Sequence, residues 1–160
     1  MPSAEKSEYT IREARPADLD IIIRHRRNMF AEMGYRQDAR FTSALEASRR
    51  HFGEQLERGT YRGWFIENTA GQIVAGGGLF ILEYPPSPRD PSPRRPLIVN
   101  MYTEPACRRR GLARRLMETM IAWCREQGFG SIMLHASAEG RPLYASLGFQ
   151  PANEMRLMVR

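Results

Sequence analysis

The sequence predicts an α+β fold, an α/β sandwich in which a mixed, mostly antiparallel sheet carries helices on both faces. Two observations lead to this prediction. Segments with strand-like and helical patterns follow one another in the order β-α-α-β-β-β-α-β-α-β. The 160 residues show no break in composition, so we expect a single domain over residues 1–160.

The first 58 residues are expected to hold one strand and two helices. Residues 9–12 have the pattern of a short strand, and residues 15–33 carry apolar side chains at the three-and-four spacing of one helical face. Gly34 ends this helix, the loop 35–40 follows, and a second amphipathic helix covers residues 43–58. We therefore expect a helix–loop–helix between the first two strands.

The middle of the chain is expected to form an antiparallel hairpin and a proline-rich loop. Strands over residues 61–67 and 72–83 flank an Asn-Thr-Ala-Gly turn. Three glycines at 76–78 interrupt the second strand, where they mark a bulge, which we favour, or the close approach of a ligand. Residues 84–96 are too rich in proline to pack as core, and we expect a loop that either gates a substrate or is a passive mobile excursion.

The C-terminal part of the chain alternates between strand and helix. A β-branched strand over residues 97–103 precedes a long amphipathic helix, which starts close to Arg109 and ends before Gly128. A strand at 131–136 and a short helix at 141–149 follow, and we expect the strands 97–103 and 131–136 to be parallel, joined by a right-handed crossover. A closing strand is expected at 154–160, with one apolar face formed by Met155, Leu157 and Val159.

The junction between the strand 97–103 and the next helix has the features of an anion site. The first N–H groups of a helix have no internal partner, and the helix dipole is positive there. Gly111 and Ala113 have little or no side chain, so the backbone can approach an anion, and three arginines at 108–110 add positive charge. The sequence thus predicts a phosphate-binding helix start; the alternative is an ordinary helix start with solvated arginines.

The composition favours an anionic partner and excludes several classes of protein. The formal net charge is +6, carried almost entirely by arginine. No apolar run reaches the ~20 residues that span a bilayer, and residues 1–8 lack the pattern of a signal peptide, so we expect a cytoplasmic protein without membrane contact. Two cysteines imply no disulfide framework. A basic nucleic-acid-binding module is an alternative, but the arginines are spread through both halves and no nucleic-acid motif is present.

Two motifs in order resemble the GNAT superfamily of acetyl-CoA-dependent N-acetyltransferases. They are Arg-x-x-Gly-x-Ala at residues 108–113 and Leu-Tyr-x-x-Leu-Gly-Phe at residues 143–149. The resemblance is strong over residues 97–149 and weaker, but consistent in element order, from Tyr9 onward. It implies the GNAT fold and an acyltransferase that uses acetyl-CoA as acyl donor, with no metal.

The resemblance also implies roles for particular residues. In the family the two parallel strands splay apart, so that backbone groups at Met101, Tyr102 and Thr103 take the pantetheine arm. The N–H of Met101 or Tyr102 would hold the oxyanion. Tyr144 matches the family's general acid for the leaving thiolate; the alternative is a core aromatic. The pyrophosphate is implied to lie on a set of helix-start residues, namely Arg108, Arg109, Arg110, Gly111, Leu112, Ala113 and Arg114.

Two further assignments keep their alternatives. A protonated amine has a pKa near 10.4, so a base should help its attack. Glu104, at the end of the central strand, is our choice; Glu83 and His135 are the other candidates, and His135 is more simply a satisfied core histidine. Ser137 stands where many family members carry asparagine, and it either contacts pantetheine or caps the next helix.

The predicted function is transfer of an acetyl group from acetyl-CoA to a primary amine of a small molecule or peptide, by direct attack in a ternary complex. In the family the helix–loop–helix covers the acceptor site, so Tyr35 and Asp38 either contact the acceptor or lie in a solvated loop. Dimers are common in the family, which makes a homodimer an expectation. The alternatives are a non-catalytic acyl-CoA sensor and the nucleic-acid-binding module.

Overall fold

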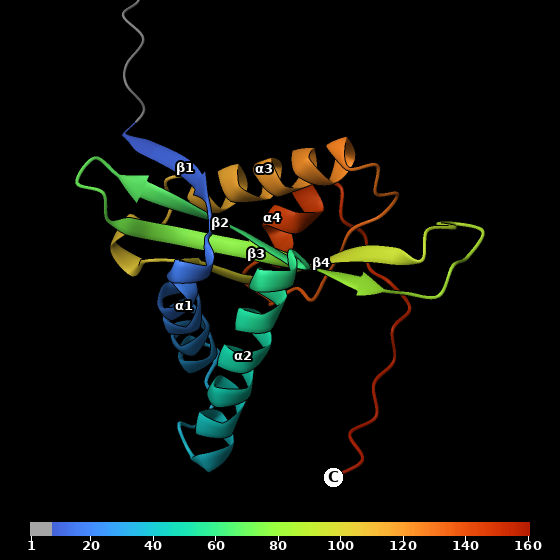
Figure 1. Cartoon of the computed structure of the whole chain (residues 1–160), viewed down its shortest axis with the longest axis horizontal. Coiled ribbons are helices and arrows are strands. Elements are labelled where there is room, and N and C mark those ends of the chain that lie inside the picture. Colours follow the sequence, from blue (N-terminus) through green and yellow to red (C-terminus); the bar gives the residue numbers. More distant parts are fainter. Residues whose placement is uncertain (1–7) are drawn as a thin grey trace, which may run out of the picture.

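The computed structural model describes residues 8–160 and contains the expected mixed sheet with helices on both faces (Figure 1). The elements are β1 (Tyr9–Glu13), α1 (Leu19–Glu32), α2 (Ala39–Arg58), β2 (Tyr61–Asn68), β3 (Ile73–Glu83), β4 (Arg94–Thr103), α3 (Leu112–Glu126), β5 (Met133–Leu134) and α4 (Arg141–Ser146), with 3-10 turns at Pro16–Asp18 and Pro105–Cys107. The sheet order is β1-β2-β3-β4-β5, and only β4 and β5 are parallel. The helices α1 and α2 cover one face, and α3 and α4 cover the other.

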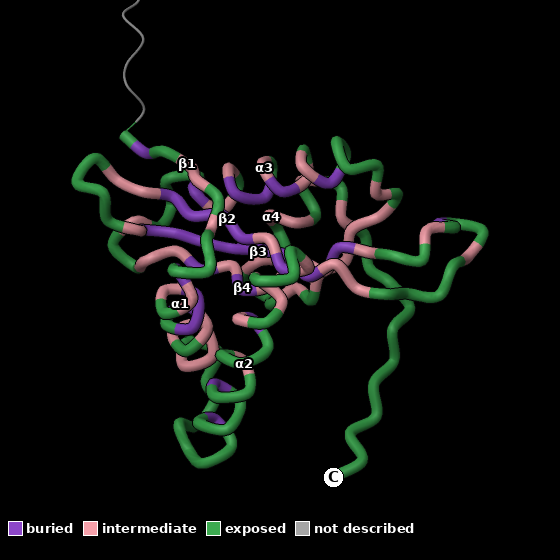
Figure 2. The backbone as a smooth tube through the Cα atoms, viewed as in Figure 1, coloured by how far each residue is buried: buried purple, intermediate pink, exposed green. Residues whose placement is uncertain are grey.

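Each face of the sheet buries its own apolar cluster (Figure 2). Under α3, Leu116, Met117 and Met120 are fully buried against β2, β3 and β4, as the helical spacing predicts. On the opposite face, Ile22 of α1 and Phe52 of α2 pack against aromatic residues of β2 and β3. The sheet is therefore covered along its middle, and the functional groups must lie at strand ends and edges.

The three glycines of β3 make room for side chains from neighbouring elements. A Cβ on Gly77 would meet the sulfur of Met101, and one on Gly78 would meet the Tyr61 hydroxyl. The favoured bulge exists, but the extra residue lies in β4: the β3–β4 register shifts between Gly76 and Gly78, so that Gly77 faces both Asn100 and Met101.

The proline-rich loop is anchored rather than loose. Residues 84–93 connect β3 and β4, and the main chain is closed by Tyr84 N donating to Pro93 O over 2.8 Å. Within it Asp90 is buried, and its carboxylate accepts from Ser131 Oγ at 2.5 Å and Arg95 Nε at 3.2 Å. These contacts fasten the loop to the segment before β5, which argues against a passive excursion.

Several element boundaries differ from the sequence prediction: α3 starts at Leu112 rather than near Arg109, and β4 starts at Arg94 rather than Leu97. The second helix starts at Ala39 rather than 43, because the Asp38 carboxylate caps it by accepting from Arg40 N and Phe41 N. Asp38 is thus a helix cap, while Tyr35 is exposed in the loop that precedes it. The strand expected over 131–136 shrinks to Met133–Leu134, which pair with Leu97 and Ile98 before the two strands separate.

The expected closing strand over residues 154–160 is wrong. The backbone of residues 150–160 makes no hydrogen bond within the described chain, and β5 is the last strand of the sheet. Met155, Leu157 and Val159 are 96%, 83% and 85% exposed. The alternation correctly indicates strand-like residues, but a strand also needs a neighbouring edge for its N–H and C=O groups, and none pairs with this one.

Candidate active site

A bulge in β4 is fixed from the α1 side. Asn100 has a positive φ of 64°, a conformation that asparagine adopts more readily than most residues. Its buried side chain donates from Nδ2 to Ile22 O at 3.0 Å and accepts from Arg26 Nη1 at 3.3 Å. The helix α1 therefore sets the direction in which β4 continues towards residues 101–104.

Beyond the bulge, one edge of β4 is open. The strand pairs with β5 only at Leu97 and Ile98, so the two strands separate before residue 99. Glu104 N donates to Val74 O of β3 at 2.8 Å, and backbone groups alternate sides along a strand. Tyr102 and Glu104 thus direct their backbone groups towards β3, whereas Met101 and Thr103 direct theirs to the open edge.

The turn that starts α3 presents a row of backbone donors. Arg109 and Gly111 have positive φ angles of 61° and 74° on either side of a residue with negative φ, which is the alternation that forms an anion-binding nest. The N–H groups of residues 109–114 donate to no acceptor among residues 8–160. Gly111 takes this conformation without a Cβ clash, and nothing lies within 4 Å of where a Cβ would be. The turn is therefore open to an anion.

The arginines around this turn are mostly held by neighbours. Arg108 donates to both Glu32 oxygens at 2.8 and 2.7 Å and, through Nε, to Thr103 O at 2.9 Å. Arg110 donates to the Tyr9 hydroxyl at 2.8 Å, and Arg114 to Ser146 Oγ at 2.6 Å. The backbone of the turn, more than these side chains, is left to contact an anion directly, while the guanidinium groups supply positive potential.

Glu104 lies where α1 meets the end of β4. Its carboxylate is 3.5 Å from Arg24 Nη2 and 4.0 Å from His25 Nε2, and its side chain is about one-third exposed. Arg24 and His25, which are neighbours on α1, thus both face the Glu104 carboxylate. Of the three candidates for a base, Glu104 is the one at the open end of β4, because Glu83 pairs with Arg94 at the strand's other end.

His25 is a buried polar residue that the sequence analysis did not single out. It is 1% exposed, packs on Phe65 and Tyr102, and its Nε2 has no hydrogen-bond partner within the described chain. Burial, with a smaller effect of Arg24, lowers the pKa of His25 to about 4, so the ring is neutral at pH 7. A histidine on the otherwise apolar, buried face of this amphipathic helix was the available signal.

Tyr144 lies on α4 with its ring against Phe149, at a centroid distance of 6.2 Å. Burial raises the pKa of its phenol, which therefore stays protonated at neutral pH. The hydroxyl has no hydrogen-bond partner in the described part of the chain, although the ring packs partly into the core beneath α3. Tyr144 thus has a packed ring and a hydroxyl group that is free to donate a hydrogen bond to a ligand.

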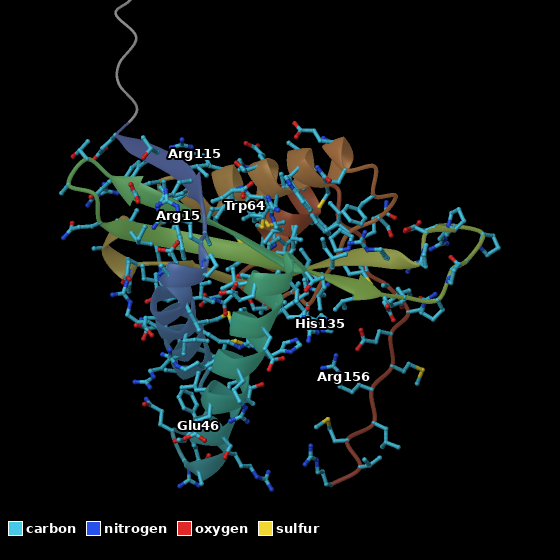
Figure 3. The ribbon with its side chains drawn as sticks, in the orientation of Figure 1. Arg15, Glu46, Trp64, Arg115, His135 and Arg156 are labelled. Carbon is cyan, nitrogen blue, oxygen red and sulfur yellow. The ribbon has the colours of Figure 1, made fainter. Side chains whose placement is uncertain are left out.

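Two other predicted residues have different surroundings from those expected. His135 is not a core histidine: its side chain is 55% exposed and contacts Glu154 and Arg156 (Figure 3). Ser137 caps a turn rather than α4 itself, because its Oγ accepts from Gly140 N at 3.2 Å and Gly140 is the helix cap. The Ser137 hydroxyl proton remains available to a ligand.

Residues 8–160 contain no group of three or more His, Cys, Asp or Glu side chains placed to hold a metal ion. No helix within them is long and apolar enough to cross a membrane.

Comparisons with known proteins agree on one family. A family model described as the Acetyltransferase (GNAT) family matches residues 27–149. A GCN5-related N-acetyltransferase from Ralstonia eutropha JMP134 is 35% identical, with a TM-score of 0.89 over 94% of this chain and 98% of that chain. A predicted acetyltransferase with acetyl-CoA from Clostridium acetobutylicum is 27% identical, with a TM-score of 0.84 over 94% and 95% of the two chains.

A more distant structure shows the fold alone. Glucosamine-6-phosphate N-acetyltransferase from Arabidopsis thaliana is 18% identical, with a TM-score of 0.66 over 95% of this chain and 99% of that chain. No curated protein matches the chain.

Proposed function

The chain belongs to the GNAT acetyltransferase family and is an acyltransferase, and from this premise we propose that it moves an acetyl group from acetyl-CoA to a primary amine. The acceptor would be a small molecule or peptide, attacking directly in a ternary complex. One observation carries the proposal: the open edge of β4 leads to a turn whose six N–H groups, at residues 109–114, have no acceptor among residues 8–160. A similar structure whose description includes acetyl-CoA supports the choice of donor.

In this proposal the donor lies along β4 and ends at α3. The N–H groups of Arg109, Arg110, Gly111, Leu112, Ala113 and Arg114 hold the pyrophosphate, as expected for a nest at a helix N-terminus. Arg108 acts at longer range, because its guanidinium is bound to Glu32. The pantetheine amides pair with the outward backbone groups of Met101 and Thr103, and the Ser137 hydroxyl donates to the same arm.

The backbone of Met101 also serves the reaction. Its N–H faces the open edge, whereas Tyr102 is paired with Gly76 of β3, so Met101 is the better donor to the developing oxyanion. Tyr144, protonated and without a hydrogen-bond partner within residues 8–160, gives its proton to the departing thiolate.

Glu104 is the general base in this scheme, directly or through one water. The Arg24 guanidinium lies 3.5 Å from the carboxylate, and the neutral His25 ring presents Nε2 to it across 4.0 Å. This separation exceeds hydrogen-bond distance, so an Nε2–H directed at the carboxylate orients Glu104 by its dipole rather than by a direct hydrogen bond. His25 would thus be a positioning residue that acts through Glu104.

The test is a thiol-release assay with acetyl-CoA against a broad panel of amines, with calorimetry of acetyl-CoA binding. We expect turnover with at least one amine, and Glu104→Gln should lower kcat by roughly 10²-fold or more while acetyl-CoA affinity holds. Glu83→Gln, at the far end of the sheet, is the matched control and should leave kcat unchanged.

The alternatives predict different results. Acetyl-CoA binding without turnover on any amine would identify a non-catalytic acyl-CoA sensor. A nucleic-acid shift that persists at raised salt, without acetyl-CoA binding, would identify the basic module, since purely phosphate-driven binding weakens steeply with salt.

A further inference from the structure

A cleft lies on the α3 face of the sheet, at the opposite end of α3 from the anion-binding turn. It has a volume of about 350 Å³, near the lower end of the range for small-molecule sites. Since α3 has 15 residues, about 22 Å separates the two ends of the helix. We call it the arginine cleft; its lining includes Arg62 of β2, Ile81 of β3, Arg94 of β4, Trp123 and Gln127 of α3, and Phe129.

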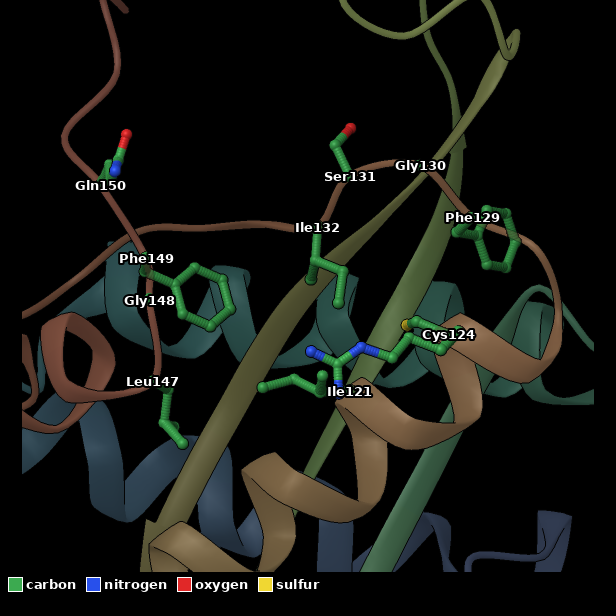
Figure 4. A pocket seen from close by; sticks show the side chains of 11 residues that line it. Ile121, Cys124, Phe129, Gly130, Ser131, Ile132, Leu147, Gly148, Phe149 and Gln150 are labelled. Carbon is green, nitrogen blue, oxygen red and sulfur yellow. The ribbon is translucent and has the colours of Figure 1, made fainter.

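The apolar part of the arginine cleft is built from two aromatic rings and one aliphatic side chain. The rings of Trp123 and Phe129 lie 6.0 Å apart at an angle of 34°, and Phe129 also lies at one end of the apolar cavity beside β5 (Figure 4). Both rings and Ile81 are only partly buried, so they present apolar surface to the cleft. Such a lining suits a planar, apolar ligand.

The two arginines of the cleft stack on these rings. The guanidinium carbon of Arg62 is 5.4 Å from the centre of the Trp123 ring, and that of Arg94 is 6.0 Å from the centre of the Phe129 ring. Aromatic and positively charged groups therefore lie side by side, and no acidic side chain lines the cleft. A ligand that matches this surface combines a ring with a negative charge.

One positive charge of the cleft is free. Arg62 donates to both Glu13 oxygens at 3.1 and 2.9 Å, whereas the Arg94 guanidinium has no hydrogen bond or ion pair within residues 8–160. Glu83 is opposite Arg94 in the β3–β4 register but forms no ion pair with it. The cleft also adjoins the negative end of the α3 dipole, which disfavours a second negative charge. The charges thus favour a monoanion over a dianion.

We infer that the arginine cleft binds a small aromatic carboxylate. The ring of the ligand packs on Trp123, Phe129 and Ile81, and its carboxylate accepts from the forked guanidinium of Arg94. The side-chain amide of Gln127 has no hydrogen-bond partner in the described part of the chain and supplies a further donor. This site is separate from the proposed donor site, so the inference does not rest on acetyl transfer.

Naphthoate, a two-ring carboxylate, tests the site by calorimetry and ¹⁵N NMR. We expect a dissociation constant of about 1 mM or lower, unchanged by saturating acetyl-CoA. The chain has two tryptophans, and the indole N–H signal of Trp123, assigned with Trp123→Phe, should shift more than that of the buried Trp64. No binding at about 5 mM naphthoate, a larger shift of Trp64, or displacement by acetyl-CoA would overturn the inference.

Variants and ligand analogues test the role of the charge. Arg94→Gln should raise the dissociation constant for naphthoate by at least about 10-fold, and the neutral naphthamide should bind the parent protein as weakly. The matched control is Arg89→Gln, which removes an exposed arginine of the neighbouring loop and should leave the affinity unchanged. Equal affinity for naphthamide, an equal effect of Arg89→Gln, or tighter binding of the dianion naphthyl phosphate would contradict a carboxylate site.

The two ends of α3 should respond independently. Gly128 lines the arginine cleft, so Gly128→Glu adds a negative charge there and should abolish naphthoate binding, whereas Gly111→Glu should retain it. Far-UV circular dichroism and thermal unfolding establish that each variant is folded. Naphthoate binding that is lost in Gly111→Glu and kept in Gly128→Glu would place the ligand at the anion-binding turn and overturn the inference.

Discussion

Removing the hydroxyl of Tyr144 distinguishes a packing role of this residue from a catalytic one. Tyr144→Phe keeps the ring against Phe149 and removes only the donor, so stability and acetyl-CoA affinity should be preserved. If the phenol protonates the thiolate, the single-turnover rate of acetyl transfer should fall by roughly 10²–10⁴. The control is Tyr84→Phe, in the proline-rich loop, where Arg95 stacks over the ring. A Tyr144→Phe rate within about twofold of the parent would show that Tyr144 has only a packing role.

The buried ring of His25 should make stability depend on pH. Its pKa in the folded protein is about 4, below the ordinary value of 6.5, so the unfolded chain binds the proton more tightly. Stability is therefore fully present above pH 6.5 and is lost as the pH falls towards 4, by up to about 3 kcal/mol. In His25→Leu this loss should be absent from denaturant unfolding curves across that range.

The same variant reports on Glu104. Without the Nε2 group Glu104 is held less well in place, so kcat should fall in His25→Leu, with acetyl-CoA affinity unchanged, and recover in His25→Gln. His51→Leu, which removes an exposed histidine of α2, is the matched control for both experiments. A stability profile that flattens in the control, or an unchanged kcat in His25→Leu, would contradict the role given to His25.

The anion site at the start of α3 can be tested with matched glutamate substitutions at the two ends of this helix. Gly111 and Gly128 flank this helix, have φ angles of 74° and 79°, and have nothing within 4 Å of a built Cβ. Glutamate at either position therefore carries the same backbone strain and the same charge. Gly111→Glu should abolish acetyl-CoA binding by calorimetry, whereas Gly128→Glu should retain it. Equal binding by both variants would mean that the phosphates lie elsewhere.

The elements differ in how well the sequence predicts them. The start and apolar face of α3 follow from periodicity and from Gly111, because both are local properties of the chain. The choice of Glu104 over Glu83 needed the β3–β4 register, which pairs residues far apart in sequence. His25 was missed because its partner, the end of β4, comes 79 residues later (104 − 25). Only folding brings the base and its neighbour together.

The whole molecule should be stabilised by its donor. A ligand that binds only the folded state at 100 times its dissociation constant adds about 2.7 kcal/mol, which for this size raises the Tm by roughly 5–10 °C. Acetyl-CoA should give this shift in thermal unfolding, and pantetheine, which lacks the phosphates, should give less. No shift with saturating acetyl-CoA would contradict the proposed donor site, and an equal shift with pantetheine would contradict the role of the nest.

The fold as a whole was predicted better than its last strand. The helices on both faces of the sheet and its mixed character follow from the succession of amphipathic segments. Residues 154–160 show the limit of that reasoning: alternation says which side chains belong together on a face, but not whether the same chain supplies the neighbouring edge. That information is a property of the assembled sheet.

The hydrogen bonds of Asp90 limit which sequence changes this protein can accept during evolution. Its carboxylate ties the loop 84–93 to Ser131, a residue 41 positions away, and burial leaves the charge dependent on that hydroxyl and on Arg95. Replacing Ser131 alone would remove one donor from this buried carboxylate and leave it to Arg95 Nε and Ser92 N, so the change is not neutral by itself. We therefore expect insertions, deletions or grafts in this loop to be accompanied by a compatible residue at position 131.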